Sequence, residues 1–103
     1  MKVVFSDEAI AGLRAIALYI ARDNKRRALS FVQELRAAAL ALGDNPNAYT
    51  LIPRYEAYGH RRKPYKAYLI IYTVHADQVL IDAVLHSARD YEAILFPEEN
   101  PEA

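Results

Sequence analysis

The chain has 103 residues, enough for one domain with a thin hydrophobic core, and no apolar run approaches the roughly 20 residues that span a bilayer. It contains no cysteine, which excludes disulfides and cysteine-based metal sites and suits the cytoplasm. Its formal net charge is zero, whereas proteins that bind nucleic-acid phosphates usually carry a basic surplus. We therefore expect a cytoplasmic domain without a signal peptide, a membrane association or strong direct nucleic-acid binding.

The first part of the chain predicts a strand followed by a helix. "KVVF" (residues 2–5) is a short β-type run, and Ser6 can cap the helix that follows. Apolar residues then recur at helical spacing over residues 10–20. A polar break follows, in which Asp23 or Asn24 can cap a second helix.

The second helix is predicted from an apolar stripe over residues 28–42, and Gly43 is expected to stop it. Because the break between the two stripes is short, the helices should pair as an antiparallel hairpin. Residues 48–59 have no regular pattern and include Pro53, which indicates a loop.

Strand character returns in the second half of the chain. "HRRKPYKAYLIIYTV" (residues 60–74) and "VLIDAVLH" (residues 79–86) are separated by the turn "HADQ". The later part of the first run and most of the second are apolar on both faces, so these strands should lie centrally in a sheet that is covered on each side. "SARDYEAILF" can then form a short helix before Pro97.

This order of elements predicts an α+β domain. We expect an N-terminal strand, an antiparallel helical hairpin packed on a small, mostly antiparallel sheet, and a short C-terminal helix or tail. Residues 1–96 would make up a single domain, and residues 97–103 would be an acidic flexible tail.

A basic stretch, "RRKPYK", contains Arg61, Arg62 and Lys63. It indicates either an edge strand with solvated charges or a cationic surface for a polyanion or an acidic partner. Because side chains alternate along a strand, Arg61 and Lys63 should point to one face and Arg62 to the other. The apolar strand that follows holds Asp82, for which Arg61 or Arg62 is a plausible ion-pair partner.

The end of the last strand, "VLHSARD", places His86 and Arg89 close together. These residues suit an acid–base group and an anion clamp, but they equally suit the polar end of a structural strand. The sequence has no phosphate-binding glycine loop, and its three histidines lack metal-ligand spacing. We therefore expect no cofactor and no metal.

Three segments in this order resemble the RelE/ParE superfamily of toxins from type II toxin–antitoxin systems: "YIARDNKRRALSFVQELR", "RRKPYKAYLIIYTV" and "VLIDAVLHSARDYEAIL". The ending "VLHSARD" is similar to that of the ParE-like branch. The resemblance implies a helical hairpin on a small antiparallel sheet, and a cognate antitoxin as partner. RelE-like members cut messenger RNA on the ribosome, whereas ParE-like members inhibit DNA gyrase.

The resemblance favours the ParE-like branch. Leu69 stands where RelE-like toxins have an arginine and Leu95 where they have a late tyrosine, while Arg89 matches a basic position. Leucine can neither stabilise phosphate charge nor transfer a proton. We therefore expect a gyrase inhibitor that acts by binding and is not an enzyme, with no catalytic residue assigned. The expected target-binding surface comprises Arg61, Arg62, Lys63, His86 and Arg89.

Two alternatives remain open. The first is a ribosome-dependent ribonuclease, in which His86 and Arg89 would be the catalytic groups. The second is a degenerate, non-toxic member of the superfamily that binds the antitoxin and acts with it as a corepressor.

Overall fold

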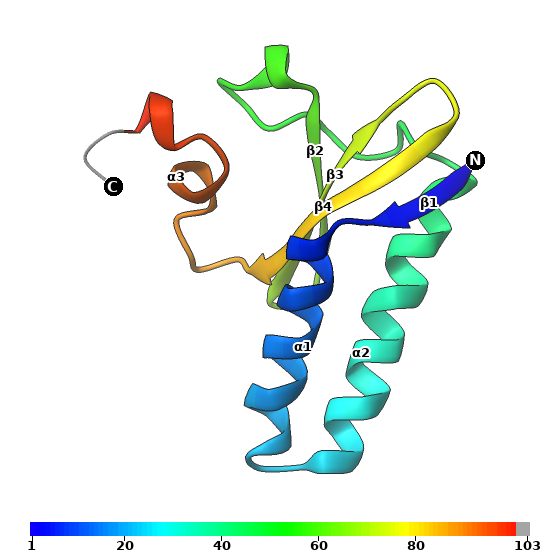
Figure 1. The fold of residues 1–103 in the computed structure, drawn as a ribbon, viewed down its shortest axis with the longest axis vertical. Coiled ribbons are helices and arrows are strands. Elements are labelled where there is room, and N and C mark those ends of the chain that lie inside the picture. The colour runs from blue at the N-terminus through cyan, green and yellow to red at the C-terminus, as the bar shows by residue number, and fades with distance from the viewer. Residues whose placement is uncertain (101–103) are drawn as a thin grey trace.

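The computed structural model describes residues 1–100 and shows a helical hairpin packed against a mixed β-sheet (Figure 1). The strand order is β1-β4-β3-β2, with β1 parallel to β4 and the other neighbouring pairs antiparallel. The elements in chain order are β1 (Lys2–Phe5), α1 (Asp7–Ala21), α2 (Lys25–Leu40), β2 (His60–Tyr65), β3 (Tyr68–Val74), β4 (Gln78–His86) and α3 (Tyr91–Leu95). The predicted α+β class, hairpin and mostly antiparallel sheet are confirmed.

Side-chain caps fix where the two long helices begin. The Ser6 hydroxyl accepts a hydrogen bond from the Ala9 amide and donates one to the Asp82 carbonyl, so it joins α1 to β4. The side chain of Asn24 accepts from the amide of Arg27 and caps α2. Of the two caps considered for the second helix, Asn24 is therefore the one used.

Gly43 does not terminate α2 in the way its type suggests. The helix ends at Leu40, and Gly43 lies in the 3-10 turn Ala41–Gly43. A Cβ atom on Gly43 would lie 2.4 Å from the carbonyl oxygen of Met1, whose amino group donates to the Gly43 carbonyl. Glycine is therefore needed here for the close approach of the N-terminus.

Both faces of the sheet are covered, as the apolar strands predict. The hairpin covers one face and buries, among others, Leu35, Tyr72 and Ile81. The loop before β2 and the C-terminal segment cover the other face, where Phe96 stacks on Tyr55 at 4.2 Å between ring centroids. The division into two clusters means that the C-terminal segment belongs to the folded core.

The expected flexible tail (residues 97–103) begins with a packed segment. Pro97–Glu99 form a 3-10 turn, and the side chain of Asn100 donates to the Phe96 carbonyl at 2.9 Å and to the Tyr55 hydroxyl at 3.0 Å. Residues 101–103 lie outside the described part of the chain. We refer to residues 92–100 as the C-terminal strap.

The partner expected for Asp82 is wrong. A register shift pairs Ile71 with Ala83 but Tyr72 with Ile81, which leaves Asp82 in a β-bulge. The bulge turns the carboxylate toward His60, whose Nε2 lies 3.9 Å from Oδ2 of Asp82. Neither Arg61 nor Arg62 is its ion-pair partner, because each is engaged elsewhere. The bulge is a tertiary feature that strand alternation alone does not reveal.

Candidate functional site

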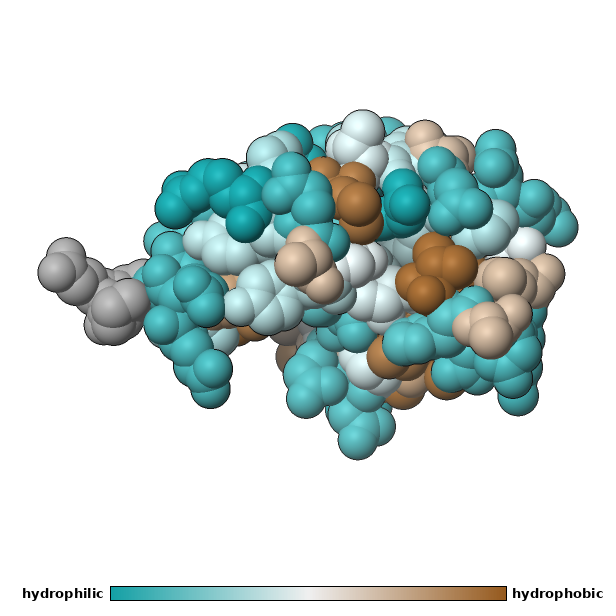
Figure 2. Space-filling model, turned by 90° about the horizontal axis from the view of Figure 1, so that it is seen from above, coloured by the Kyte–Doolittle hydropathy of each residue, from teal (hydrophilic) through white to brown (hydrophobic). Residues whose placement is uncertain are grey.

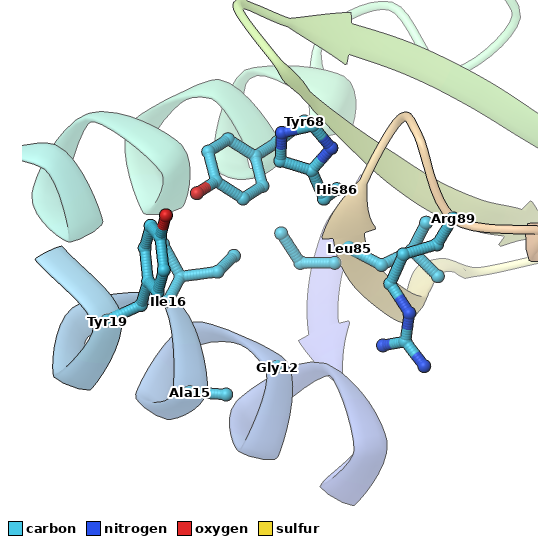
Figure 3. Close-up of a pocket in the computed structure, with 9 residues that line it drawn as sticks. Gly12, Ala15, Ile16, Tyr19, Tyr68, Leu85, His86 and Arg89 are labelled. Atoms are coloured by element: carbon cyan, nitrogen blue, oxygen red, sulfur yellow. The ribbon is translucent and has the colours of Figure 1, made fainter.

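A pocket of about 310 Å³ lies between α1 and the end of β4. Figure 3 shows Tyr19, Tyr68 and His86 gathered at one end and Arg89 at the other, with Gly12 and Ala15 of α1 along the base. Its lining residues are Gly12, Ala15, Ile16, Tyr19, Tyr68, Val84, Leu85, His86 and Arg89. We call this the α1–β4 pocket.

Small residues on α1 create the base of the pocket. Gly12, Ala15, Ile16 and Tyr19 are spaced three, four and seven residues apart, so they share one flank of the helix. At Gly12 the helix backbone approaches β4 so closely that an added Cβ would lie 2.4 Å from the Val84 carbonyl oxygen. The close approach sets the floor, and the short side chain of Ala15 leaves the space above it open.

His86 is held at the rim with a defined hydrogen-bonding role. Its Nδ1 accepts a hydrogen bond from the Ala88 amide at 3.0 Å, and its ring meets the Tyr68 ring edge-on at 5.2 Å between centroids. Because Nδ1 accepts, the proton of the neutral ring is assigned to Nε2. His86 therefore has one ring N–H available to donate to a bound group.

Arg89 is an exposed cation with no internal partner among residues 1–100, where its guanidinium makes no ion pair and no side-chain hydrogen bond. The neighbouring carboxylate of Asp90 is used locally, because it accepts from the Ala93 amide and caps α3. The positive charge of Arg89 is thus available to a molecule outside this chain.

The basic residues of β2 are engaged within the fold. Arg61 donates to the Tyr49 carbonyl and Lys63 to the Ala38 carbonyl, each at 2.7 Å. Arg62 donates to the Tyr91 hydroxyl on the opposite side of the strand. The predicted alternation is thereby confirmed, and burial lowers the pKa of Lys63.

The five residues expected to form the target-binding surface are therefore divided. His86 and Arg89 line the α1–β4 pocket together, whereas Arg61, Arg62 and Lys63 lie on the edge strand and face two sides of the sheet. The sequence patterns do not single out Gly12, Ala15, Tyr19 or Tyr68, which also line the pocket. The signal that could have indicated this site is the run of small residues at helical spacing along α1.

Two further groups of titratable side chains lie outside the pocket. Glu34 accepts from Arg27 and from the Tyr65 hydroxyl, and these hydrogen bonds lower its pKa to about 2. Burial raises the pKa of Asp82, where neither Oδ2 nor the Nδ1 of His60 has a hydrogen-bond partner in the described residues. No group of three metal-ligating side chains occurs within residues 1–100.

The positions that distinguish RelE-like ribonucleases lie in the second core cluster. Leu69 is 7% exposed and packs with Ile71 and Phe96, and Leu95 packs against the same cluster. These side chains are apolar and engaged in packing, so neither can stabilise the charge of a phosphate group or transfer a proton. The surface seen from the end opposite the hairpin turn is mainly hydrophilic, with scattered apolar groups (Figure 2).

The comparisons with known proteins agree with the fold. The family described as "ParE toxin of type II toxin-antitoxin system, parDE" matches residues 3–91. The chain belongs to the ParE toxin family. A solved structure described as the chromosomal ParDE TA system from P. aeruginosa has a TM-score of 0.69 and 19% identity, and the match covers 84% of this chain and 95% of that chain. A search among curated proteins finds no match.

The family match covers the α1–β4 pocket but not the C-terminal strap. The match to the ParE toxin family includes the whole α1–β4 pocket but ends at Tyr91, so the C-terminal strap lies beyond it. An antitoxin partner is implied by this toxin–antitoxin family. No helix within the described residues of this ParE-family chain is long and apolar enough to cross a membrane.

Proposed function

We propose that this ParE-family chain is a toxin that inhibits DNA gyrase through a protein interface and is neutralised by a cognate antitoxin. The observation that carries the proposal is the family match over residues 3–91, which includes both long helices, β2 to β4, most of β1 and the pocket. Gyrase is a cytoplasmic enzyme, so the proposed target implies action in the cytoplasm.

The side chains present favour binding over catalysis. A ribonuclease needs a group that stabilises phosphate charge and a group that transfers a proton, held around one reacting centre. Here Leu69 and Leu95 occupy two of the expected positions, and both pack in the second core cluster, to which the C-terminal strap contributes. His86 and Arg89 instead line a pocket against α1, which suits an interface better than a nuclease site.

Of the residues proposed for the target-binding surface, Arg89 is the one whose replacement tests binding most directly. It is exposed and unpaired among the described residues, whereas Arg61, Arg62 and Lys63 each hold a contact that the fold needs. Loss of toxicity on replacing one of those three would not separate binding from folding. Arg89→Ala is therefore the informative change, and Arg26→Ala, at an exposed arginine at the start of α2, is its matched control.

Two experiments test the proposed function. The purified chain should inhibit supercoiling by gyrase, and its expression without antitoxin should stop bacterial growth with filamentation and a DNA-damage response. Arg89→Ala should weaken both effects, and Arg26→Ala should retain them. Normal growth under strong expression of folded protein, together with unaffected gyrase, would refute the proposal.

The nuclease alternative has its own readout. Primer extension on transcripts after induction should reveal no new cleavage sites within codons. New cuts that depend on Arg89 would instead assign the chain to ribosome-dependent cleavage. A chain that binds the antitoxin but neither inhibits gyrase nor cuts transcripts would be the non-toxic corepressor.

A further inference from the structure

We propose that Arg62 and Tyr91 are positioning residues for Arg89, and that their hydrogen bond holds the turn of residues 87–90 beside the α1–β4 pocket. The inference deepens the proposed function, on which it rests, because it takes Arg89 as part of the surface that binds the target. It gives Arg62 a role other than the direct contact with the target that the basic stretch predicts.

The turn that carries Arg89 is held to the sheet at its beginning. The amide of Ser87 donates to the Ala67 carbonyl at 2.8 Å. The amides of Ala88 and Arg89 both donate to His86, so these two hydrogen bonds fold the turn back on the end of β4. The residues of the turn are exposed. The position of its far end therefore depends on α3, which follows it directly in the chain.

The backbone couples α3 to Arg89. The Tyr91 amide donates to the Arg89 carbonyl at 2.8 Å, and the Asp90 carboxylate caps the helix at the Ala93 amide. α3 has five residues, and a helix this short is not stable in water by itself. Figure 1 shows α3 lying apart from the hairpin, beyond the end of β4. The contacts that dock α3 on the rest of the fold therefore determine where Arg89 lies.

α3 is docked at both of its ends. At the first residue of the helix, the Tyr91 hydroxyl accepts a hydrogen bond from Arg62 of β2. At the other end, Leu95 and Phe96 pack in the second core cluster, and the Tyr91 ring packs against the same cluster. The contact between Tyr91 and Arg62 is the one next to the turn. It is therefore the contact that fixes the backbone at Arg89.

The environment of Arg62 suits this docking role. Arg62 lies on an edge strand, is partly buried, and makes no ion pair with any residue of the described range 1–100. Its side chain donates to the Tyr91 hydroxyl. Removing the partner of a partly buried charged group costs more than removing the partner of a neutral group. The fold therefore favours the docked position of Tyr91, while the guanidinium of Arg89 stays exposed at the pocket (Figure 3).

Tyr91→Phe tests the inference, because it removes the hydroxyl and keeps the ring on the core cluster. In the isolated chain, the amides of residues 88–94 should exchange hydrogen about 10-fold faster, since a hydrogen bond to a charged group changes an equilibrium on this scale. Inhibition of gyrase supercoiling should weaken about 3- to 10-fold, because only the docked fraction binds with full affinity. The control Tyr72→Phe removes a hydroxyl that donates to the Pro46 carbonyl, and it should leave both measurements unchanged.

Substitutions of Arg62 and a double variant separate positioning from a general loss of stability. Arg62→Lys keeps a charged donor and should retain both properties, whereas Arg62→Met keeps an apolar chain without a donor and should match Tyr91→Phe. Tyr91→Phe should add no further loss of inhibition to Arg89→Ala, because both changes remove the same contact with the target. A loss that came from a weaker fold would add to that of Arg89→Ala. Thermal melting confirms that each variant is folded.

The outcomes separate this inference from the proposed function. Unchanged exchange in both Tyr91→Phe and Arg62→Met would overturn the positioning role and leave the toxin proposal standing. Wild-type inhibition by Tyr91→Phe, together with loss of inhibition in Arg62→Met, would assign Arg62 to direct contact with the target and overturn the inference. A wild-type chain that leaves gyrase untouched would refute the proposed target, whereas faster exchange in both variants would still support the hold of Arg62 and Tyr91 on the turn.

Discussion

Replacing Gly12 by alanine should destabilise this protein, although the change favours a helix. Alanine is about 0.8–1.0 kcal/mol better than glycine inside a helix, so propensity alone predicts a more stable α1. In this structure the added Cβ would lie 2.4 Å from the Val84 carbonyl oxygen, well inside van der Waals contact. The two effects oppose each other, and their magnitudes decide the sign.

The steric effect should be the larger one. Restoring ordinary contact requires α1 and β4 to separate by about 1 Å, and a gap of 0.5–1 Å removes about a quarter to a half of each affected dispersion contact. The buried residues Leu13 and Ile16 pack on the same side of α1 and would lose contact with the sheet. Overpacking of this kind costs about 1–3 kcal/mol, and in this tight approach to backbone we expect the net loss to be about 1–2 kcal/mol.

Urea denaturation of Gly12→Ala measures the change in the free energy of unfolding. The variant Ala15→Gly measures the helix-propensity difference between alanine and glycine in the same helix and serves as the reference. Ala15 is an exposed residue of the same helix, so Ala15→Gly reports the local propensity difference with little change in packing. We expect both variants to be less stable than the wild type. A Gly12→Ala protein that gains as much stability as Ala15→Gly loses would show that α1 does not press on β4, and the account of the pocket floor would be wrong.

Three other predictions follow from the cited contacts. Glu34, whose pKa is lowered to about 2, should stabilise the fold above pH 4.5 and lose that effect as the pH falls toward 2, so Glu34→Gln should flatten the acid limb of melting temperature against pH. Burial raises the pKa of Asp82, so its ionised form opposes folding at neutral pH. Asp82→Asn should therefore raise the melting temperature at pH 7, with an advantage that shrinks as the pH falls and is lost by about pH 4, and no gain at pH 7 would contradict this. Phe96→Ala should lower the free energy of unfolding by at most about 3–5 kcal/mol, because local release of the C-terminal strap limits the loss. Hydrogen exchange of the strap amides checks that limit, and unchanged exchange would show that Phe96 does not anchor the strap.

Local chemistry determined the parts of the fold that the sequence could predict. Ser6 and Asn24 act on amides three residues away, so the starts of both long helices were predictable from residue type. The alternation of Arg61, Arg62 and Lys63 follows from the geometry of any strand. The apolar runs of the last two strands likewise required cover on both faces, which the structure provides.

The candidate site was only half predictable. His86 and Arg89 follow one another closely in the chain, so their proximity could be expected from the strand end on which they lie. Gly12 and Ala15 are more than 70 residues away from them, and nothing local links a small residue on a helix to the end of a distant strand. Which of the tyrosines would contribute to the site was equally a question of packing.

The sequence by itself determined the elements, their caps and the faces they bury, because those properties depend on neighbours a few residues apart. Only the tertiary structure decided which distant surfaces meet. Three contacts join segments that are far apart in the chain. The β-bulge places Asp82 near His60, the C-terminal strap covers the second face of the sheet, and Gly12 lies against the backbone of Val84. The α1–β4 pocket exists because a helix backbone comes close enough to a strand to leave space beside Ala15, and that distance is set by the packing of the whole core.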